Sequence, residues 1–235
     1  MQEIKNGIDR THLNKSVSFP VICRTYSVIY MEIMKIAILV DGGFFDAVNK
    51  NRVNGMLPTA DHVKQEVDNT MRLIRAKTLT DSENIKDVLF RVYFYDARPF
   101  SGKKTNPQGE EYDFTLSKSY VAKTDLLNEL ARTDKFCLRL GMLSFAGWQP
   151  KIDDNGTLTG YRPSFKQKGV DIKVGMDMVW IATHKVVDKI AIIGGDSDFI
   201  DPIEFAKREG IQVYLNHMGL KVKDELIQSC DFELK

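Results

Sequence analysis

The sequence has few cysteines. The three present, Cys23, Cys137 and Cys230, are widely separated, and none belongs to a paired CxxC spacing. An odd and scattered set excludes a disulfide framework, and a zinc knuckle would need paired spacings. We therefore expect a protein of a reducing compartment, which indicates a cytoplasmic location.

The sequence also lacks an excess of charge of either sign and any long apolar run. Lys and Arg number 33 and Asp and Glu 32, so the net charge is +1 and no global field attracts a polyanion. No run approaches the roughly 20 apolar residues that span a bilayer. The first 30 residues carry scattered basic and polar residues instead of a continuous apolar segment. We expect neither export nor a membrane partner, and any contact with nucleic acid must be local.

The length and composition indicate one domain. A chain of 235 residues with 43% hydrophobic and 28% charged residues is typical of a globular protein with one sizeable core. Residues 1–33 form a leader of uncertain structure, without clear periodicity, and a native start at Met31 or Met34 is compatible with the sequence. We place the domain at residues 34–235. A homodimer is compatible with this composition.

Apolar runs and helical patterns alternate along the domain. Short buried strands are predicted at 35–40, 88–95, 136–145, 189–193 and 211–215, and helices at 58–74, 116–130, 170–181, 199–209 and 224–230. Two polar stretches, 98–113 and 146–168, are predicted to be exposed loops, and the second contains a turn signal at Asp154-Asn155-Gly156. This alternation predicts an α/β fold with a mainly parallel sheet, covered by helices on both faces as a three-layer α/β/α sandwich.

Aspartates follow two of the predicted strands. Asp41 comes directly after the first strand, and Asp196 and Asp198 follow the fourth. In an open parallel sheet, ligands bind outside the carboxyl ends of the strands where the strand order reverses. Asp171 begins a helix, three residues before the inward-facing Val174, so it is expected at the same cleft. The four carboxylates are therefore predicted to converge.

Four converging carboxylates repel one another unless a cation binds them. Oxygen donors without His or Cys select hard ions, so Mg²⁺ or Mn²⁺ is expected. Such ions activate water and stabilise the leaving oxygen of a phosphodiester. The predicted reaction is metal-dependent hydrolysis, with Asp41, Asp171, Asp196 and Asp198 as both metal ligands and catalytic residues.

Glycines and basic residues surround this predicted site. Gly42-Gly43 and Gly194-Gly195 allow the backbone to approach a ligand closely. Local positive charge is available to bind a strand through Arg98, Lys103, Lys104, Arg162, Lys166, Lys168 and Lys173, with Tyr161 and Phe165 interleaved as stacking surfaces. Arg98, Lys168 and Lys173 are the candidates for direct contact with nucleic acid.

Three separated motifs resemble a known family. VDGGFF at 40–45, KGVDIKVGMDM at 168–178 and IIGGDSDFIDPIEFAKREGIQV at 192–213, with the closing LIQSCDFEL, are similar to the NYN domain, also called the LabA-like or DUF88 group of PIN-like nucleases. The resemblance covers about 35–232 and implies a PIN-like α/β/α fold and metal-dependent RNase activity. It places the acidic cluster on the same four aspartates, and we add Asp177 and Ser197 as supporting residues. Phe44 stands where the family often has Asn.

Three hypotheses follow. The first is an endoribonuclease acting on single-stranded or structured RNA. The second is a non-catalytic module that binds RNA or a protein on the same fold, which Phe44 favours. The third is a small-molecule phosphohydrolase, which Gly43 disfavours because an aspartyl-phosphate route needs an aspartate there. Each aspartate also has a simpler interpretation as a helix cap. Asp96, His184 and His217 are weaker candidates.

Overall fold

The computed structural model describes residues 19–22, 28–52, 57–78 and 85–235. Its main sheet has eight strands in the order β10-β9-β8-β2-β3-β6-β7, with β1 paired to β2. The strands are β1 (Phe19–Ile22), β2 (Val28–Asp41), β3 (Ile85–Arg98), β6 (Phe136–Ile152), β7 (Leu158–Lys168), β8 (Lys189–Ile193), β9 (Gln212–Asn216) and β10 (Phe232–Glu233), and β4 (Lys103–Thr105) pairs with β5 (Glu111–Asp113) in a separate hairpin. The helices are α1 (Gly42–Arg52), α2 (Ala60–Thr78), α3 (Lys118–Ala131), α4 (Asp171–Thr183), α5 (Ile200–Arg208) and α6 (Asp224–Ser229), with short 3₁₀ turns η1 (Phe114–Leu116) and η2 (Ser197–Phe199).

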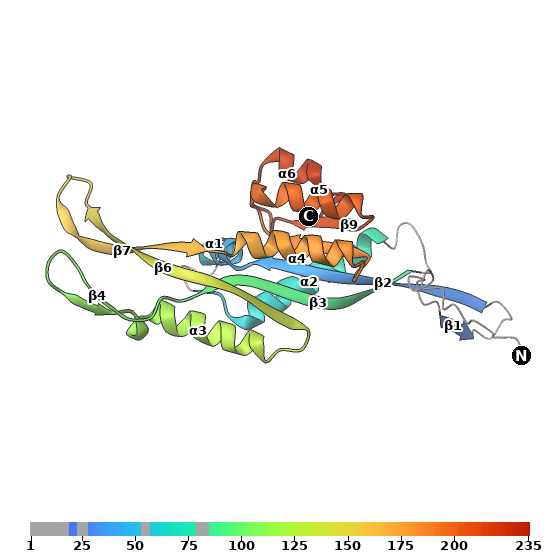
Figure 1. Ribbon diagram of the computed structural model, residues 1–235, viewed down its shortest axis with the longest axis horizontal. Coiled ribbons are helices and arrows are strands. Elements are labelled where there is room, and N and C mark those ends of the chain that lie inside the picture. The colour runs from blue at the N-terminus through green and yellow to red at the C-terminus, as the bar shows by residue number, and fades with distance from the viewer. Residues whose placement is uncertain (1–18, 23–27, 53–56, 79–84) are drawn as a thin grey trace, which may run out of the picture.

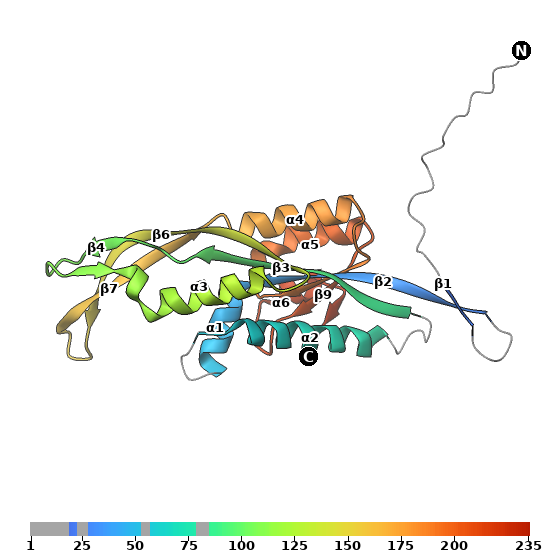
Figure 2. The ribbon, with the colours of Figure 1, turned by 90° about the horizontal axis from the view of Figure 1, so that it is seen from below.

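Helices cover both faces of the sheet. Figure 2 shows α4 and α5 on one side of β2 and β3, and α1, α2 and α3 on the other. The central strand β2 supplies both cores because its side chains alternate: Leu39 packs into the cluster under α4 and α5, whereas Ile38 and Val40 pack into the cluster under α1 and α2. A strand that is buried on both faces needs the continuous apolar run that the sequence shows. The predicted three-layer α/β fold with a mainly parallel sheet is confirmed.

The strand order reverses between β2 and β8. These two strands pair in parallel, with Val40 opposite Ile193. From β2 the chain continues outward to β3 and β6, whereas from β8 it continues in the opposite direction to β9 and β10. The carboxyl ends of β2 and β8 therefore lie side by side at a topological switch point.

The predicted loop at 146–168 is wrong. Strand β6 continues to Ile152 and pairs antiparallel with β7, and the ribbon extends away from the helical layers in Figure 1. The polar residues that suggested a loop face solvent on this ribbon, while Phe145, Trp148 and Phe165 pack together on it. The turn predicted at Asp154-Asn155-Gly156 does connect the two strands. The other predicted loop, 98–113, likewise contains the small β4-β5 hairpin.

The first predicted strand, 35–40, is longer in the structure. Strand β2 begins at Val28 and pairs antiparallel with β1, so the predicted boundary between residues 33 and 34 falls inside a strand. The rest of the proposed leader, residues 1–18 and 23–27, lies outside the described residues. Among the helices that the structure describes, none is long and apolar enough to cross a membrane.

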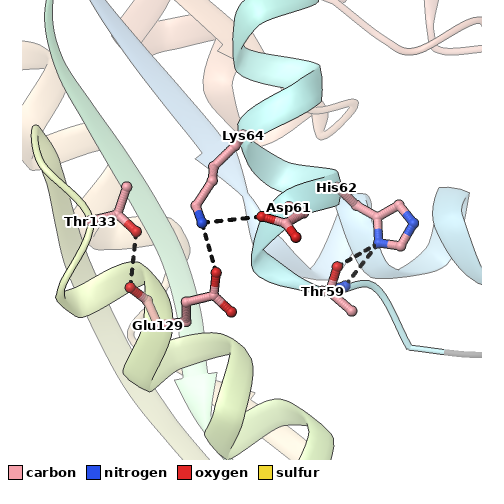
Figure 3. A network of polar contacts seen from close by, with 6 residues as sticks. All are labelled: Thr59, Asp61, His62, Lys64, Glu129 and Thr133. Carbon is pink, nitrogen blue, oxygen red and sulfur yellow. Dashed lines mark hydrogen bonds and ion pairs between the residues drawn. The ribbon is translucent and has the colours of Figure 1, made fainter.

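Two ion pairs connect separate elements of the fold. Lys189 at the start of β8 binds Asp87 on β3 at 2.7 Å, and their side chains are only 2% and 1% exposed. On the surface, Lys64 of α2 contacts Asp61 of the same helix and Glu129 of α3, as Figure 3 shows. The first pair is fully buried and the second is largely hydrated, so they differ strongly in the cost of losing one partner.

Candidate metal centre

Asp41 is the last residue of β2 and is partly buried. Its Oδ1 accepts a hydrogen bond of 3.1 Å from the backbone N–H of Phe44, at the start of α1. The backbone N–H of Gly43 also donates to this carboxylate. Asp41 therefore caps α1, as the simpler interpretation of the sequence expected, and the same contacts fix its carboxylate at the switch point.

Asp196 and Asp198 follow β8 on the neighbouring strand. Asp196 caps η2, because its Oδ1 accepts a hydrogen bond of 3.0 Å from the backbone N–H of Asp198. The turn passes close to Asp41: a Cβ added at Gly194 would lie 3.5 Å from the Cβ of Asp41. Asp196 is partly buried and Asp198 is exposed. The two strand ends thus bring these aspartates to one edge of the sheet.

Asp171 is the first residue of α4, and its side chain is exposed. Its position in the first turn places a carboxylate at the positive end of the helix dipole. The following turns of α4 bury Val174 and Met178 against the sheet, as the helical pattern predicted. This anchoring sets the amino end of α4 beside the turn that carries Asp196 and Asp198.

The carboxylates influence one another. Burial raises the pKa of Asp41 to about 6, the N–H groups of Phe44 and Gly43 oppose that shift, and the charges of Asp171 and Asp196 add to it. Partial loss of hydration raises the pKa of Asp171 as well, and the charges of Asp196 and Asp198 raise it further. Each of the four aspartates therefore enters this mutual repulsion, which makes the fully ionised cluster unfavourable without a bound cation.

The donor set fits a hydrated hard cation. Within the described ranges, no three Asp, Glu, His or Cys side chains lie close enough together to hold one ion directly. Mg²⁺ commonly keeps several of its waters and takes only one or two protein carboxylates, the rest of its shell coming from substrate phosphates. The repelling carboxylates at the switch point match that requirement better than they match a closed cage such as a structural zinc site.

Phe44 occupies the edge of this site. A Cβ added at Gly195 would lie 2.5 Å from Cε2 of Phe44 and 2.9 Å from Cγ1 of Val222. The ring therefore packs directly on the glycine backbone next to Asp196. A side chain at position 195 would therefore collide with the ring, which explains the glycine there. The ring also makes that side of the cluster apolar, whereas an Asn at position 44 would offer an amide.

Asp177 and Ser197 each have a partner. Arg139 binds Asp177 through two hydrogen bonds of 2.6 Å, and the hydroxyl of Tyr95 donates to Asp177 at 3.0 Å. These contacts tie α4 to β3 and β6. The hydroxyl of Ser197 accepts a hydrogen bond of 3.0 Å from Lys223. A supporting role of either residue toward the metal stays a prediction.

The basic candidates lie near this edge. Arg98 at the end of β3 and Lys168 at the end of β7 both pair in register with Met142 of β6, and both are exposed. Lys173 lies in the first turns of α4 and is partly buried. Lys103 pairs with Glu111 at 2.9 Å, so part of the predicted basic surface is neutralised locally.

One buried cluster was not predicted from the sequence. Lys123 of α3 binds Asp46 of α1 at 2.5 Å and Asp96 of β3 at 2.6 Å. Asp96 was a weak candidate because it follows a strand, but Asp46 and Lys123 lie inside helices and 77 positions apart. Only the packing of α1 and α3 on the same face reveals that they meet.

We expect Asp41→Asn to stabilise the metal-free protein at high pH. The folded pKa of about 6 lies above the ordinary carboxyl pKa of 3.8, so ionised Asp41 destabilises the fold above pH 6, and this cost disappears as the pH falls toward 4. The shift corresponds to at most about 3 kcal/mol, and Asn still accepts the N–H of Phe44. Urea denaturation in EDTA at pH 8 and pH 4 measures the effect. Equal stability of both proteins at pH 8 would contradict it.

A protein-family model matches part of this chain. The NYN domain model matches residues 125–234, a range that contains Asp171, Asp196 and Asp198 and begins after Asp41. The crystal structure of a protein of unknown function from Vibrio parahaemolyticus RIMD 2210633 is similar with a TM-score of 0.43 and 18% identity, over 86% of this chain and 91% of that chain. No curated protein matches this chain. The resemblance to the NYN domain, a nuclease-like family, is therefore confirmed over residues 125–234.

Proposed function

We propose that this protein is a metal-dependent endoribonuclease that hydrolyses phosphodiester bonds at the carboxyl ends of β2 and β8. The observation that carries the proposal is the gathering of carboxylates at the switch point, where burial raises the pKa of Asp41 to about 6 and the charges of Asp171 and Asp196 add to the rise. A protein gains nothing structurally from such repulsion, and charge of this kind is common where a site is built to hold a cation. The NYN match over residues 125–234 supports the same class of reaction.

Asp41, Asp171, Asp196 and Asp198 would hold Mg²⁺ or Mn²⁺, one or two of them directly and the others through its bound waters. When bound, such an ion activates water and stabilises charge on the phosphoryl oxygens and the leaving oxygen. The chain itself contributes orientation: backbone N–H groups fix the carboxylates of Asp41 and Asp196 before any substrate arrives. Donors that are set in advance do not need to reorganise during the reaction.

RNA would reach this site along the edge where β3, β6 and β7 meet. Arg98 and Lys168 flank Met142 there and offer two exposed positive charges to phosphates, while Lys173 lies on α4 beside Asp171. Because the net charge of the whole chain is only +1, attraction of RNA depends on such local groups and on neutralisation of the acidic cluster by the cation. Binding and cleavage should therefore both need the metal.

Cleavage of labelled RNA tests the proposed function. Single-stranded RNA, a hairpin RNA and single-stranded DNA are incubated with the protein in Mg²⁺, in Mn²⁺ and in EDTA. We expect internal cuts in RNA that require a metal ion. Cleavage that proceeds equally in EDTA would refute the metal mechanism.

A non-catalytic RNA-binding module is the second candidate. The packing of Phe44 on Gly195 favours it, because an apolar ring lines the cluster where a polar amide would assist a bound water. In the same assay a pure binder would retain RNA on a filter in Mn²⁺ without shortening it. Substitution Phe44→Asn would then leave RNA intact, whereas a nuclease should tolerate or gain from the added amide.

A further inference from the structure

A hollow lies beside the acidic cluster. It has a volume of about 510 Å³ and is formed between α1, α3, the end of β3 and the β7 strand of the ribbon. Gly43 lines it, and the N–H of Gly43 donates to Asp41. The hollow is therefore directly adjacent to the candidate metal centre, on the side of the sheet opposite α4. Its volume falls in the range of pockets that bind small organic groups, about 300–1,000 Å³.

Aromatic rings form one wall of this hollow. Phe100, Phe114 and Phe165 line it, and their ring centroids lie 5.5 to 6.0 Å from one another or from Phe145. All three are only partly buried, although phenylalanine is commonly buried completely. Phe100 lies between β3 and β4, Phe114 in η1 and Phe165 on β7. The ribbon that the sequence did not predict therefore completes this wall. An aromatic wall of this kind suits a flat, partly apolar ligand.

The polar end of the hollow is acidic overall. Lys123, Asp46 and Asp96 line it, with side-chain exposures of 12%, 15% and 6%. Lys50 and Asp113 also line the hollow, so two ammonium groups face three carboxylates and one net negative charge remains. Oδ1 of Asp46 has no hydrogen-bond partner among the described residues. An N–H group of a ligand suits this end, whereas a phosphate would be repelled.

We propose that this hollow binds one unpaired nucleobase of the RNA strand, with the base against the aromatic wall and its N–H edge toward the carboxylates. The inference deepens the proposed function, because the adjoining phosphate would then lie at the acidic cluster next to Gly43. Sequence-tolerant stacking of single-stranded bases on aromatic rings is a general mode of RNA binding. The protein would thus require a flexible, unpaired nucleotide beside the cleaved bond.

A neutral nucleoside tests this pocket independently of cleavage. 2-Aminopurine riboside carries no phosphate, needs no metal, and loses fluorescence when its base stacks on an aromatic ring. We expect saturable quenching by the wild-type protein in EDTA, with competition by guanosine and none by ribose 5-phosphate. Absence of saturable quenching, or equal competition by ribose 5-phosphate, would overturn the pocket proposal even if the protein cleaves RNA.

Two variants and a matched control locate the binding. Phe100→Leu keeps an apolar side chain but removes a stacking face, and should weaken nucleoside binding by about 10-fold. Ser119→Leu fills the mouth of the hollow from an exposed helix position and should weaken binding similarly without touching the core. Phe90→Leu makes the same exchange in the amino-terminal half of β3, away from the hollow, and should bind like wild type. Unchanged affinity in both Phe100→Leu and Ser119→Leu would refute the assignment.

Nucleoside binding and RNA cleavage can fail separately. If the nucleoside binds at this pocket but no RNA is cut, the proposed nuclease activity is wrong. The pocket inference then holds, and the protein is an RNA-binding module. If RNA is cut in a metal-dependent manner but the nucleoside does not bind, the nuclease proposal stands and the pocket inference is wrong.

Discussion

Asp196→Asn is expected to lower metal-dependent RNA cleavage by at least about 100-fold, since loss of groups that merely support metal ligands already costs about 10- to 100-fold. The substitution removes one negative charge from the cluster while leaving the local structure intact. Asn can still accept the backbone N–H of Asp198 through its side-chain oxygen, so the cap of η2 is preserved. The loss would therefore report on charge and metal binding and not on folding.

Single-turnover cleavage rates in Mg²⁺ and in Mn²⁺ measure this effect. Glu129→Gln is the matched control, because it also removes one carboxylate charge but lies on the outer surface of α3, paired with Lys64. It should cleave at the wild-type rate. A rate for Asp196→Asn within a few-fold of wild type would show that this aspartate does not take part in the reaction.

Lys189→Met is expected to produce the largest loss of stability, about 3–5 kcal/mol, because removing one partner of a buried ion pair leaves the other charge uncompensated. Lys189 and Asp87 are both almost fully buried, and their 2.7 Å contact joins β8 to β3 across β2. The ammonium also donates to the hydroxyl of Thr78 at the end of α2. Without it, the carboxylate of Asp87 would remain in the core and lose the ammonium that pairs with it.

Urea denaturation of the single and double variants separates charge from packing. The double variant Lys189→Met with Asp87→Leu removes both charges and should recover most of the lost free energy of unfolding, since apolar replacements of buried ion pairs are often neutral. Lys64→Met, which breaks a surface pair, should change stability by less than about 1 kcal/mol. A small loss for Lys189→Met, equal to that of Lys64→Met, would contradict this account.

The layered fold was predictable because its signals are local. Continuous apolar runs at Ile36–Val40 and Ile190–Ile193 specify strands buried on both faces, and the spacing of Val174, Met178 and Ile181 specifies the inward face of α4. The strand-end rule then placed Asp41 beside Asp196 without knowledge of the register. The structure adds the pairing that makes those two ends neighbours.

What the sequence did not reveal depends on long-range packing. The β6-β7 ribbon carries glycine, proline and polar residues that are typical of a loop. It becomes a hairpin through the antiparallel pairing of its two strands and the packing of Phe145, Trp148 and Phe165 on it. The contacts of Lys123 with Asp46 and Asp96 join three elements of the fold, and no spacing along the chain predicts them. The hollow that these three residues line depends on the same long-range packing.

The measurement that tests the central claim most directly is a calorimetric titration of the metal-free protein with Mn²⁺ near neutral pH. The claim is that Asp41, Asp171, Asp196 and Asp198 together hold a hard divalent cation. We expect saturable binding by wild type and by Glu129→Gln, and affinity at least about 10-fold weaker in both Asp41→Asn and Asp196→Asn. Equal Mn²⁺ affinity in all four proteins, or no binding by wild type, would contradict the claim.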